Sequence, residues 1–139
     1  MFRNLSIRLG VAFAAAAFGS AALAQGTLGS ADPATVGFKR AVAQRIIQID
    51  KPKAAQGGLK GISVVGYTLD RKGNITEQWI VRSSGDDKLD ARAIAILRKA
   101  APLPAPPATI FGAEQYTHLS EAWLFTSDGH YKLQSLVSN

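Results

Sequence analysis

The chain has 139 residues, contains no cysteine and carries a formal net charge of +6. Its length corresponds to one domain. The absence of cysteine excludes a disulfide-stabilised fold, so a hydrophobic core must hold the domain together. The basic residues are dispersed, with no run of five like charges, which argues against a nucleic-acid-binding tail.

The first 24 residues have the order of a secretory signal peptide. Arg3 and Arg8 precede an apolar run, and Ala22 and Ala24 form the small-residue pattern of a cleavage site. Cleavage after Ala24 would release a periplasmic protein that starts at Gln25. The alternative is an uncleaved inner-membrane anchor, but the apolar run is shorter than the about 20 residues that a spanning helix needs.

A helix is expected after a short polar stretch. Residues 25–34 are small and polar and predict a disordered lead-in, so the domain is expected to span residues 35–139. Thr35 is a candidate N-cap, and Pro52 ends the helix because proline disfavours the α conformation in the preceding residue. Apolar residues at helical spacing form one stripe: Phe38, Val42, Ile46 and Ile49.

Two strands joined by a tight turn follow. Residues 62–70 are rich in β-branched and aromatic side chains, and residues 75–82 form the returning strand. Gly73 lies in the turn between them, where it can adopt positive φ. Alternation along the first strand places three large side chains on one face: Val65, Tyr67 and Leu69.

The next segment predicts a capped amphipathic helix. Asp86 or Asp87 can cap it, and Asp90 follows Asp87 at the spacing of a capping box. Pro102 and Pro104 prevent its continuation. The apolar stripe of this helix consists of Leu89, Ala93, Ile96, Leu97 and Ala100.

The remaining elements complete a small α+β fold. Residues 116–127 predict a third strand, and residues 131–137 predict a short fourth strand. The order α-β-β-α-β(-β) predicts a two-layer sandwich, with an antiparallel three- to four-stranded sheet and two helices on one of its faces.

The sequence shows no clustered set of catalytic or metal-binding residues. His118 lies in a predicted strand and His130 beside a turn, and neither has a clustered partner. The segment around Ser84 lacks the G-x-S-x-G pattern of a hydrolase nucleophile. Asp86, Asp87 and Asp90 lack the spacing of a calcium loop. We therefore expect no enzyme activity, no cofactor, no bound metal and no nucleic-acid partner.

A series of short motifs runs from the first strand to the proline-rich segment. They are a glycine pair three apart, an Asp-x-x-Gly turn, a Ser-Ser-Gly sequence, a Leu-Asp pair followed by an alanine, and a proline-rich exit. The residues concerned are Gly58, Gly61, Asp70, Gly73, Ser84, Gly85, Leu89, Asp90, Ala93, Pro102 and Pro104. In this order and spacing, over about residues 52–126, the chain resembles the C-terminal domain of TonB-family energy transducers.

The resemblance implies a non-enzymatic module that captures extended peptide segments of outer-membrane receptors by strand addition. The transported substrates would be iron chelates of the siderophore type or vitamin B12. A free strand edge offers unpaired backbone groups to an incoming strand, and it would also allow a homodimer. The candidate edge is the third strand, with the candidate site residues Thr117, His118, Leu119, Ser120, Glu121 and Trp123.

The chain departs from the family pattern in two respects. Lys51 precedes Pro52 where the family commonly has tyrosine, and residues 25–59 are too few for the family's long periplasmic spacer at about 3.3 Å per residue. The resemblance therefore implies the fold and the binding mode, but not coupling to an inner-membrane motor. The alternative is a TolA-like or other structural periplasmic envelope protein, because the terminal domain of TolA has a similar element order.

Overall fold

The computed structural model describes residues 32–51 and 58–137, which form one α+β domain. The predicted signal peptide and most of the predicted lead-in lie outside the described residues. In chain order the elements are α2 (Pro33–Ile49), β1 (Gly61–Asp70), β2 (Ile75–Arg82), α3 (Asp87–Ala100), the 3-10 helix η2 (Ala108–Ile110), β3 (Tyr116–Phe125), β4 (Tyr131–Leu133) and α4 (Gln134–Val137). Within the described ranges, no helix is both long and apolar enough to cross a membrane.

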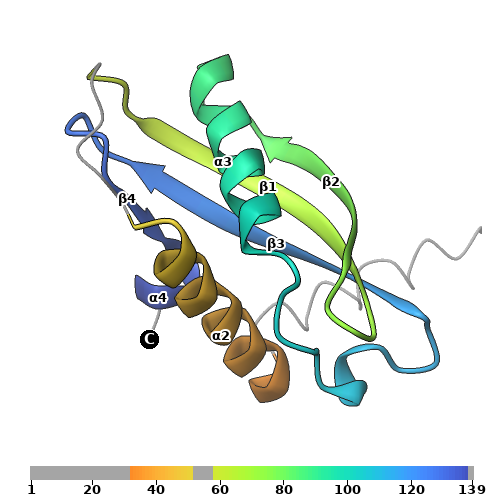
Figure 1. The fold of residues 1–139 in the computed structure, drawn as a ribbon. Helices are drawn as coiled ribbons and strands as arrows, with labels where there is room; N and C mark the ends of the chain where they lie inside the picture. Colours follow the sequence, from red (N-terminus) through yellow and green to blue (C-terminus); the bar gives the residue numbers. More distant parts are fainter. Residues whose placement is uncertain (1–31, 52–57, 138–139) are drawn as a thin grey trace, which may run out of the picture. The chain divides into compact units, whose positions relative to one another are not determined.

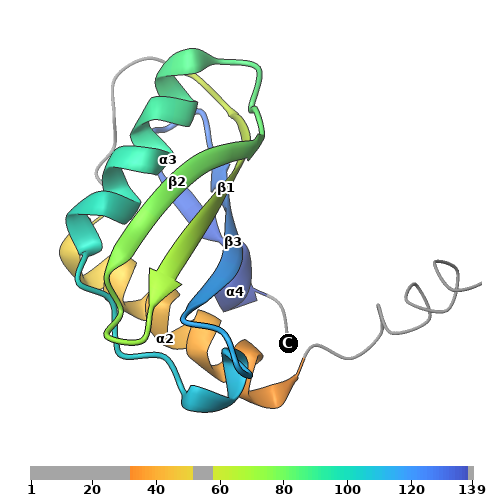
Figure 2. The same cartoon turned by 90° about the vertical axis from the view of Figure 1, so that its right-hand side faces the viewer.

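The four strands form one antiparallel sheet in the order β2-β1-β3-β4. Both long helices, α2 and α3, lie on the same face of this sheet (Figures 1 and 2). No described element covers the opposite face, which is called the open face below. The predicted two-layer α+β sandwich is therefore confirmed.

The core lies between the two helices and the sheet, as the periodic patterns predict. The predicted stripe of α3 is buried along its whole length, and α2 contributes Phe38, Val42 and Ile46. The three predicted inward residues of β1 are also buried, at 0–1% exposure. The remaining core side chains come mainly from β3 and β4: Trp123, Phe125, Tyr131 and Leu133.

Both long helices begin at an aspartate. The carboxylate of Asp86 accepts hydrogen bonds from the backbone N–H groups of Lys88 (2.8 Å) and Leu89 (3.1 Å), which selects one of the two predicted caps of α3. For α2 the predicted cap is wrong. Asp32, and not Thr35, caps this helix by accepting from the Thr35 N–H (3.2 Å). The helix therefore starts at Pro33, inside the predicted lead-in.

The predicted fourth strand is wrong over its last four residues. Strand β4 ends at Leu133, and Gln134–Val137 form a single helical turn, α4. The reason is a buried carboxylate on the neighbouring strand: Glu121 accepts a hydrogen bond from the Ser135 N–H (3.1 Å). This bond holds the chain in a turn where a continuing strand would need its backbone groups for the sheet.

Asp90 also differs from its prediction, because it is not part of a capping box. Its side chain is buried, at 7% exposure, and accepts hydrogen bonds from the Ser63 hydroxyl (2.7 Å) and from the Ser84 N–H and hydroxyl (2.8 Å each). The Ser83 hydroxyl is a further donor. Burial raises the pKa of Asp90, but the hydrogen bonds from Ser83, Ser63 and Ser84 outweigh it and hold this pKa well below its usual range.

Replacing this carboxylate by an amide should destabilise the domain. We expect Asp90→Asn to lower the free energy of unfolding at pH 7 by about 1.5–3 kcal/mol, the range for hydrogen bonds to a charged group. A depressed pKa contributes stability above the unfolded pKa of about 3.9, and this contribution is lost as the pH falls below that value. The gap between parent and variant should therefore narrow between pH 7 and pH 3 in urea denaturation.

Asp87→Asn provides the control, because Asp87 is an exposed carboxylate in the first turn of the same helix. Its midpoint should shift little at either pH. Equal urea-denaturation midpoints for Asp90→Asn and Asp87→Asn at pH 7 would show that the buried carboxylate does not stabilise the connection between β2 and α3.

The turn between β1 and β2 packs against the proline-rich exit of α3. Gly73 has φ of +89°, and its carbonyl accepts a hydrogen bond from the Leu103 N–H (3.0 Å). A Cβ at Gly73 would lie 2.3 Å from the Leu103 carbonyl oxygen. The turn itself is closed by Asp70, whose carboxylate accepts from the N–H groups of Lys72 (2.8 Å) and Asn74 (2.9 Å). Gly73 is thus required both by its conformation and by the close approach of the backbone.

These two requirements can be separated, because Gly85 has the same φ of +89° but no atom within 4 Å of the position that a Cβ would take. Gly85→Ala should show the conformational cost alone, about 1–3 kcal/mol. Gly73→Ala should cost more, because the Leu103 carbonyl must also move. Thermal unfolding of the two variants provides the comparison. Equal losses of stability would contradict the close packing of the turn against Leu103.

Candidate functional site

The outer edge of β3 is only partly covered by its neighbour. Strand β4 pairs with Trp123, Leu124 and Phe125, at the C-terminal end of the ten-residue strand. From Tyr116 to Ala122 no described strand pairs with β3 on this side. This part of the sheet is where an additional strand could join.

The hydrogen bonds at the end of β3 show which residues turn their backbone groups outward. The Thr126 N–H donates to the His130 carbonyl (2.9 Å), on the β4 side. Residues of an antiparallel strand alternate the side to which they direct both backbone groups. The residues that face away from β1 are therefore Tyr116, His118, Ser120, Ala122 and Leu124.

Glu121 closes this edge at one point. Its side chain is only 2% exposed, and its Oε1 accepts hydrogen bonds from the Ala122 N–H (3.0 Å) and the Ser135 N–H (3.1 Å). Burial, reinforced by this nearby carboxylate, raises the pKa of Tyr67. Because the Ala122 N–H already donates to Glu121, the outward backbone N–H groups left for a partner are those of Tyr116, His118 and Ser120. The outward side of β3 over these residues is called the free edge below.

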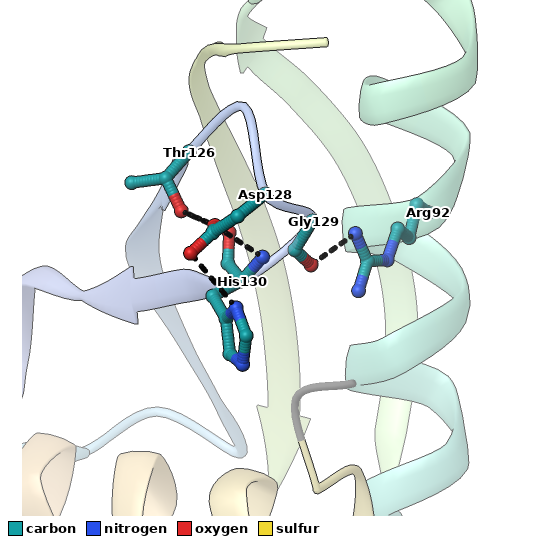
Figure 3. Close-up of polar contacts among 5 residues, drawn as sticks. All are labelled: Arg92, Thr126, Asp128, Gly129 and His130. Carbon is teal, nitrogen blue, oxygen red and sulfur yellow. Dashed lines mark hydrogen bonds and ion pairs between the residues drawn. The ribbon is translucent and has the colours of Figure 1, made fainter. Parts of the chain in front are cut away.

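The β4 hairpin that limits the free edge is fixed to the helix layer by Arg92 of α3 (Figure 3). The guanidinium donates to the Gly129 carbonyl (3.0 Å). It also lies over the rings of Phe125 (5.3 Å) and Tyr131 (5.7 Å). Within the turn, Asp128 accepts from the Thr126 hydroxyl and the His130 N–H (3.1 Å). The hairpin is therefore held by α3 and by hydrogen bonds within its own turn. These contacts fix the point at which the free edge ends.

The structure divides the six predicted edge residues into two sets. His118 and Ser120 belong to the free edge and place their side chains on the open face. Thr117, Leu119, Glu121 and Trp123 direct their backbone groups to β1 and their side chains to the helix layer. Trp123 is fully buried and pairs with Leu133, so it lies outside the free edge. Tyr116 belongs to the edge but is missing from the predicted set.

The opposite edge of the sheet is β2, which is less regular. The pairing of β1 with β2 shifts register twice, between Val64 and Val65 and between Thr68 and Leu69. The pairing of β1 with β3 runs without a shift through ten residue pairs, from Gly61 with Phe125 to Asp70 with Tyr116. Bulges protect an edge against further pairing, so β3 presents the better template for an added strand.

A hollow of about 560 Å³ lies on the open face beside the free edge. It is lined by residues from three strands and from the loop before β3: Thr68, Thr76, Glu77, Glu114, Tyr116 and His118. Sequence reasoning named only His118 among these residues, because the other five come from separate parts of the chain. Within the described residues, no group of three His, Asp or Glu side chains is placed to hold a metal ion.

The motif residues do not form the free edge, although Asp70 pairs with Tyr116 of that edge; the close backbone approaches of the motifs lie at two corners of the scaffold. Gly61 starts β1 at the corner where β2 turns into α3, and a Cβ there would lie 3.0 Å from the Ser84 carbonyl oxygen. Ser84 in turn binds Asp90. At the other corner, Gly73 meets the segment that contains Pro104. These residues hold the scaffold and do not form the edge.

Known proteins identify the class to which this scaffold belongs. Residues 52–118 match the family model described as Gram-negative bacterial TonB protein C-terminal. The solution structure of the Helicobacter pylori TonB C-terminal domain is similar, with a TM-score of 0.52 and 26% identity, over 77% of this chain and 92% of that one. The HasB C-terminal domain gives a TM-score of 0.49 and 22% identity, over 75% and 93% of the two chains. No curated protein sequence matches the chain.

Residues 52–118 of the described domain therefore match the TonB C-terminal family, as the motifs indicated. This family consists of protein-interaction domains of the Gram-negative envelope and is not enzymatic. The matched region begins before β1 and ends at His118, on the free edge.

Proposed function

We propose that this protein is a periplasmic TonB-like module that binds extended peptide segments of outer-membrane TonB-dependent receptors. The segment would add to the sheet as a further strand at the free edge of β3. The module would thereby serve energy-dependent transport of siderophore- or vitamin-type substrates.

The observation that carries the proposal is the exposed row of outward backbone groups at Tyr116, His118 and Ser120. Strand addition derives its affinity from main-chain hydrogen bonds, while the alternating side chains set the register. The ten regular pairs between β1 and β3 leave this edge without a bulge, and Arg92 holds the hairpin at its end. The family match supports receptor segments as the partner class.

A proline substitution tests the mode of binding. Ser120→Pro removes an outward N–H that no strand of the domain uses, so the fold should persist. Binding of synthetic peptides from the periplasmic N-terminal segments of the receptors in the same bacterium should weaken about tenfold or more, because one backbone bond is lost and the strand is blocked sterically. Fluorescence anisotropy gives the affinity, and circular dichroism reports the fold.

Two control variants separate backbone from side-chain effects. Ser120→Ala keeps the backbone donor and should bind nearly as the parent does. Leu119→Pro removes an N–H directed to β1 and should unfold the domain. Parental affinity in folded Ser120→Pro would reject strand addition at this edge. Absence of receptor-peptide binding by the parent itself would instead favour the structural, TolA-like role.

The proposed location has its own test. The signal-peptide pattern predicts that the mature protein starts at Gln25. N-terminal sequencing of the protein from the periplasmic fraction should find this start. Recovery of an intact Met1 end from membranes would contradict the prediction and support an anchored transducer.

A further inference from the structure

The hollow beside the free edge is open, negatively charged and built around one row of the sheet. Glu77 of β2 pairs with Thr68 of β1, and Thr68 pairs with His118 of β3. These three side chains lie on the open face, and all three line the hollow. The Thr68 hydroxyl and His118 Nδ1 are hydrogen-bonded (2.9 Å), which fixes the middle of the row.

Two carboxylates line this hollow without an ion pair in the described domain. Glu77 and Glu114 are exposed, and neither carboxylate forms an ion pair with a described residue. Arg71 lies beside Glu114, where its guanidinium donates to the Gly112 and Glu114 backbone carbonyls (3.4 and 2.7 Å) and lies over the Phe111 ring (4.8 Å). The six lining residues include no lysine or arginine.

A strand added to the free edge would extend the row by one residue. Directly opposed residues of neighbouring strands project their side chains to the same face, about 4.5–5.5 Å apart. The partner residue opposite His118 would therefore project onto the open face beside the hollow. A short side chain would stop at His118, whereas a long one can lie across it toward Thr68.

We infer that the partner segment carries a lysine or arginine at this position. This inference rests on the proposed strand addition and extends it to the sequence of the partner. The methylene stem of such a side chain would pack along His118 and Tyr116, which is 53% exposed. The cationic head would then be directed along the row toward the carboxylates of Glu77 and Glu114. The Tyr116 ring offers a further favourable surface for a cation.

Peptide selection tests the inference even where the receptor is unidentified. A phage-displayed library of random ten-residue peptides is selected on the parent protein, with counter-selection on Ser120→Pro to retain binders of the free edge. Lysine or arginine should be enriched at one position of the aligned clones. A second selection on the Glu77→Gln/Glu114→Gln double variant should lose this enrichment, whereas one on Asp87→Asn should keep it, because Asp87 lies in α3 on the other side of the sheet.

A synthetic peptide pair then gives the magnitude. Replacing the enriched basic residue of a selected peptide by methionine should weaken binding to the parent about three- to tenfold, the effect of one or two exposed ion pairs. The same replacement should leave binding to the double variant nearly unchanged. Binders of the free edge without a basic preference, or with one that persists in the double variant, would overturn the inference and leave strand addition intact. A selection that yields no clone sensitive to Ser120→Pro would reject the proposed function itself.

Discussion

The buried carboxylate of Asp90 fixes the corner at which β2 turns into α3. Three serines from the central strand and the connecting loop donate to it, so α3 begins at a defined height above β1. The long helix then presents its apolar stripe to the sheet, and its Arg92 reaches the β4 hairpin. The position of the hairpin determines how much of β3 stays unpaired. The hydrogen bonds at the start of α3 therefore help to set the boundary of the free edge.

This arrangement explains why the motif residues and the proposed binding residues are different residues. The glycines, serines and prolines of the motifs allow close backbone approaches, as between Gly73 and Leu103. Such approaches tolerate only certain residue types at fixed positions, and they are therefore visible as a pattern in the sequence. The free edge needs only backbone groups and a regular ladder, which many side chains permit. A family pattern can therefore specify the scaffold strongly and the edge weakly.

The sequence predicted the elements that depend on periodicity. The stripe of α3 and the inward residues of β1 follow from spacing alone, and both are buried. Three local predictions were wrong because carboxylate contacts that the local pattern does not show decided them: the cap of α2, the end of β4 and the capping-box role of Asp90. Asp32 lies outside the apolar pattern that suggested Thr35, and Glu121 holds Ser135 across fourteen residues of sequence. Which residues of β3 direct their backbone groups outward depends on the pairing with β1 and β4. The hollow is formed by residues from several segments, from Thr68 to His118. Neither could be read from side-chain patterns.

The shortness of the free edge has a consequence for the strength of any complex. Three outward donors at every second residue engage a partner segment of about five residues, or about 17 Å of strand. Each bond contributes on the order of 1 kcal/mol net, which is small against the loss of translational and rotational freedom on association. Such a complex would form and dissociate rapidly. Its occupancy would then be governed by how closely the two partners are confined, because tethering raises the effective concentration without any new contact.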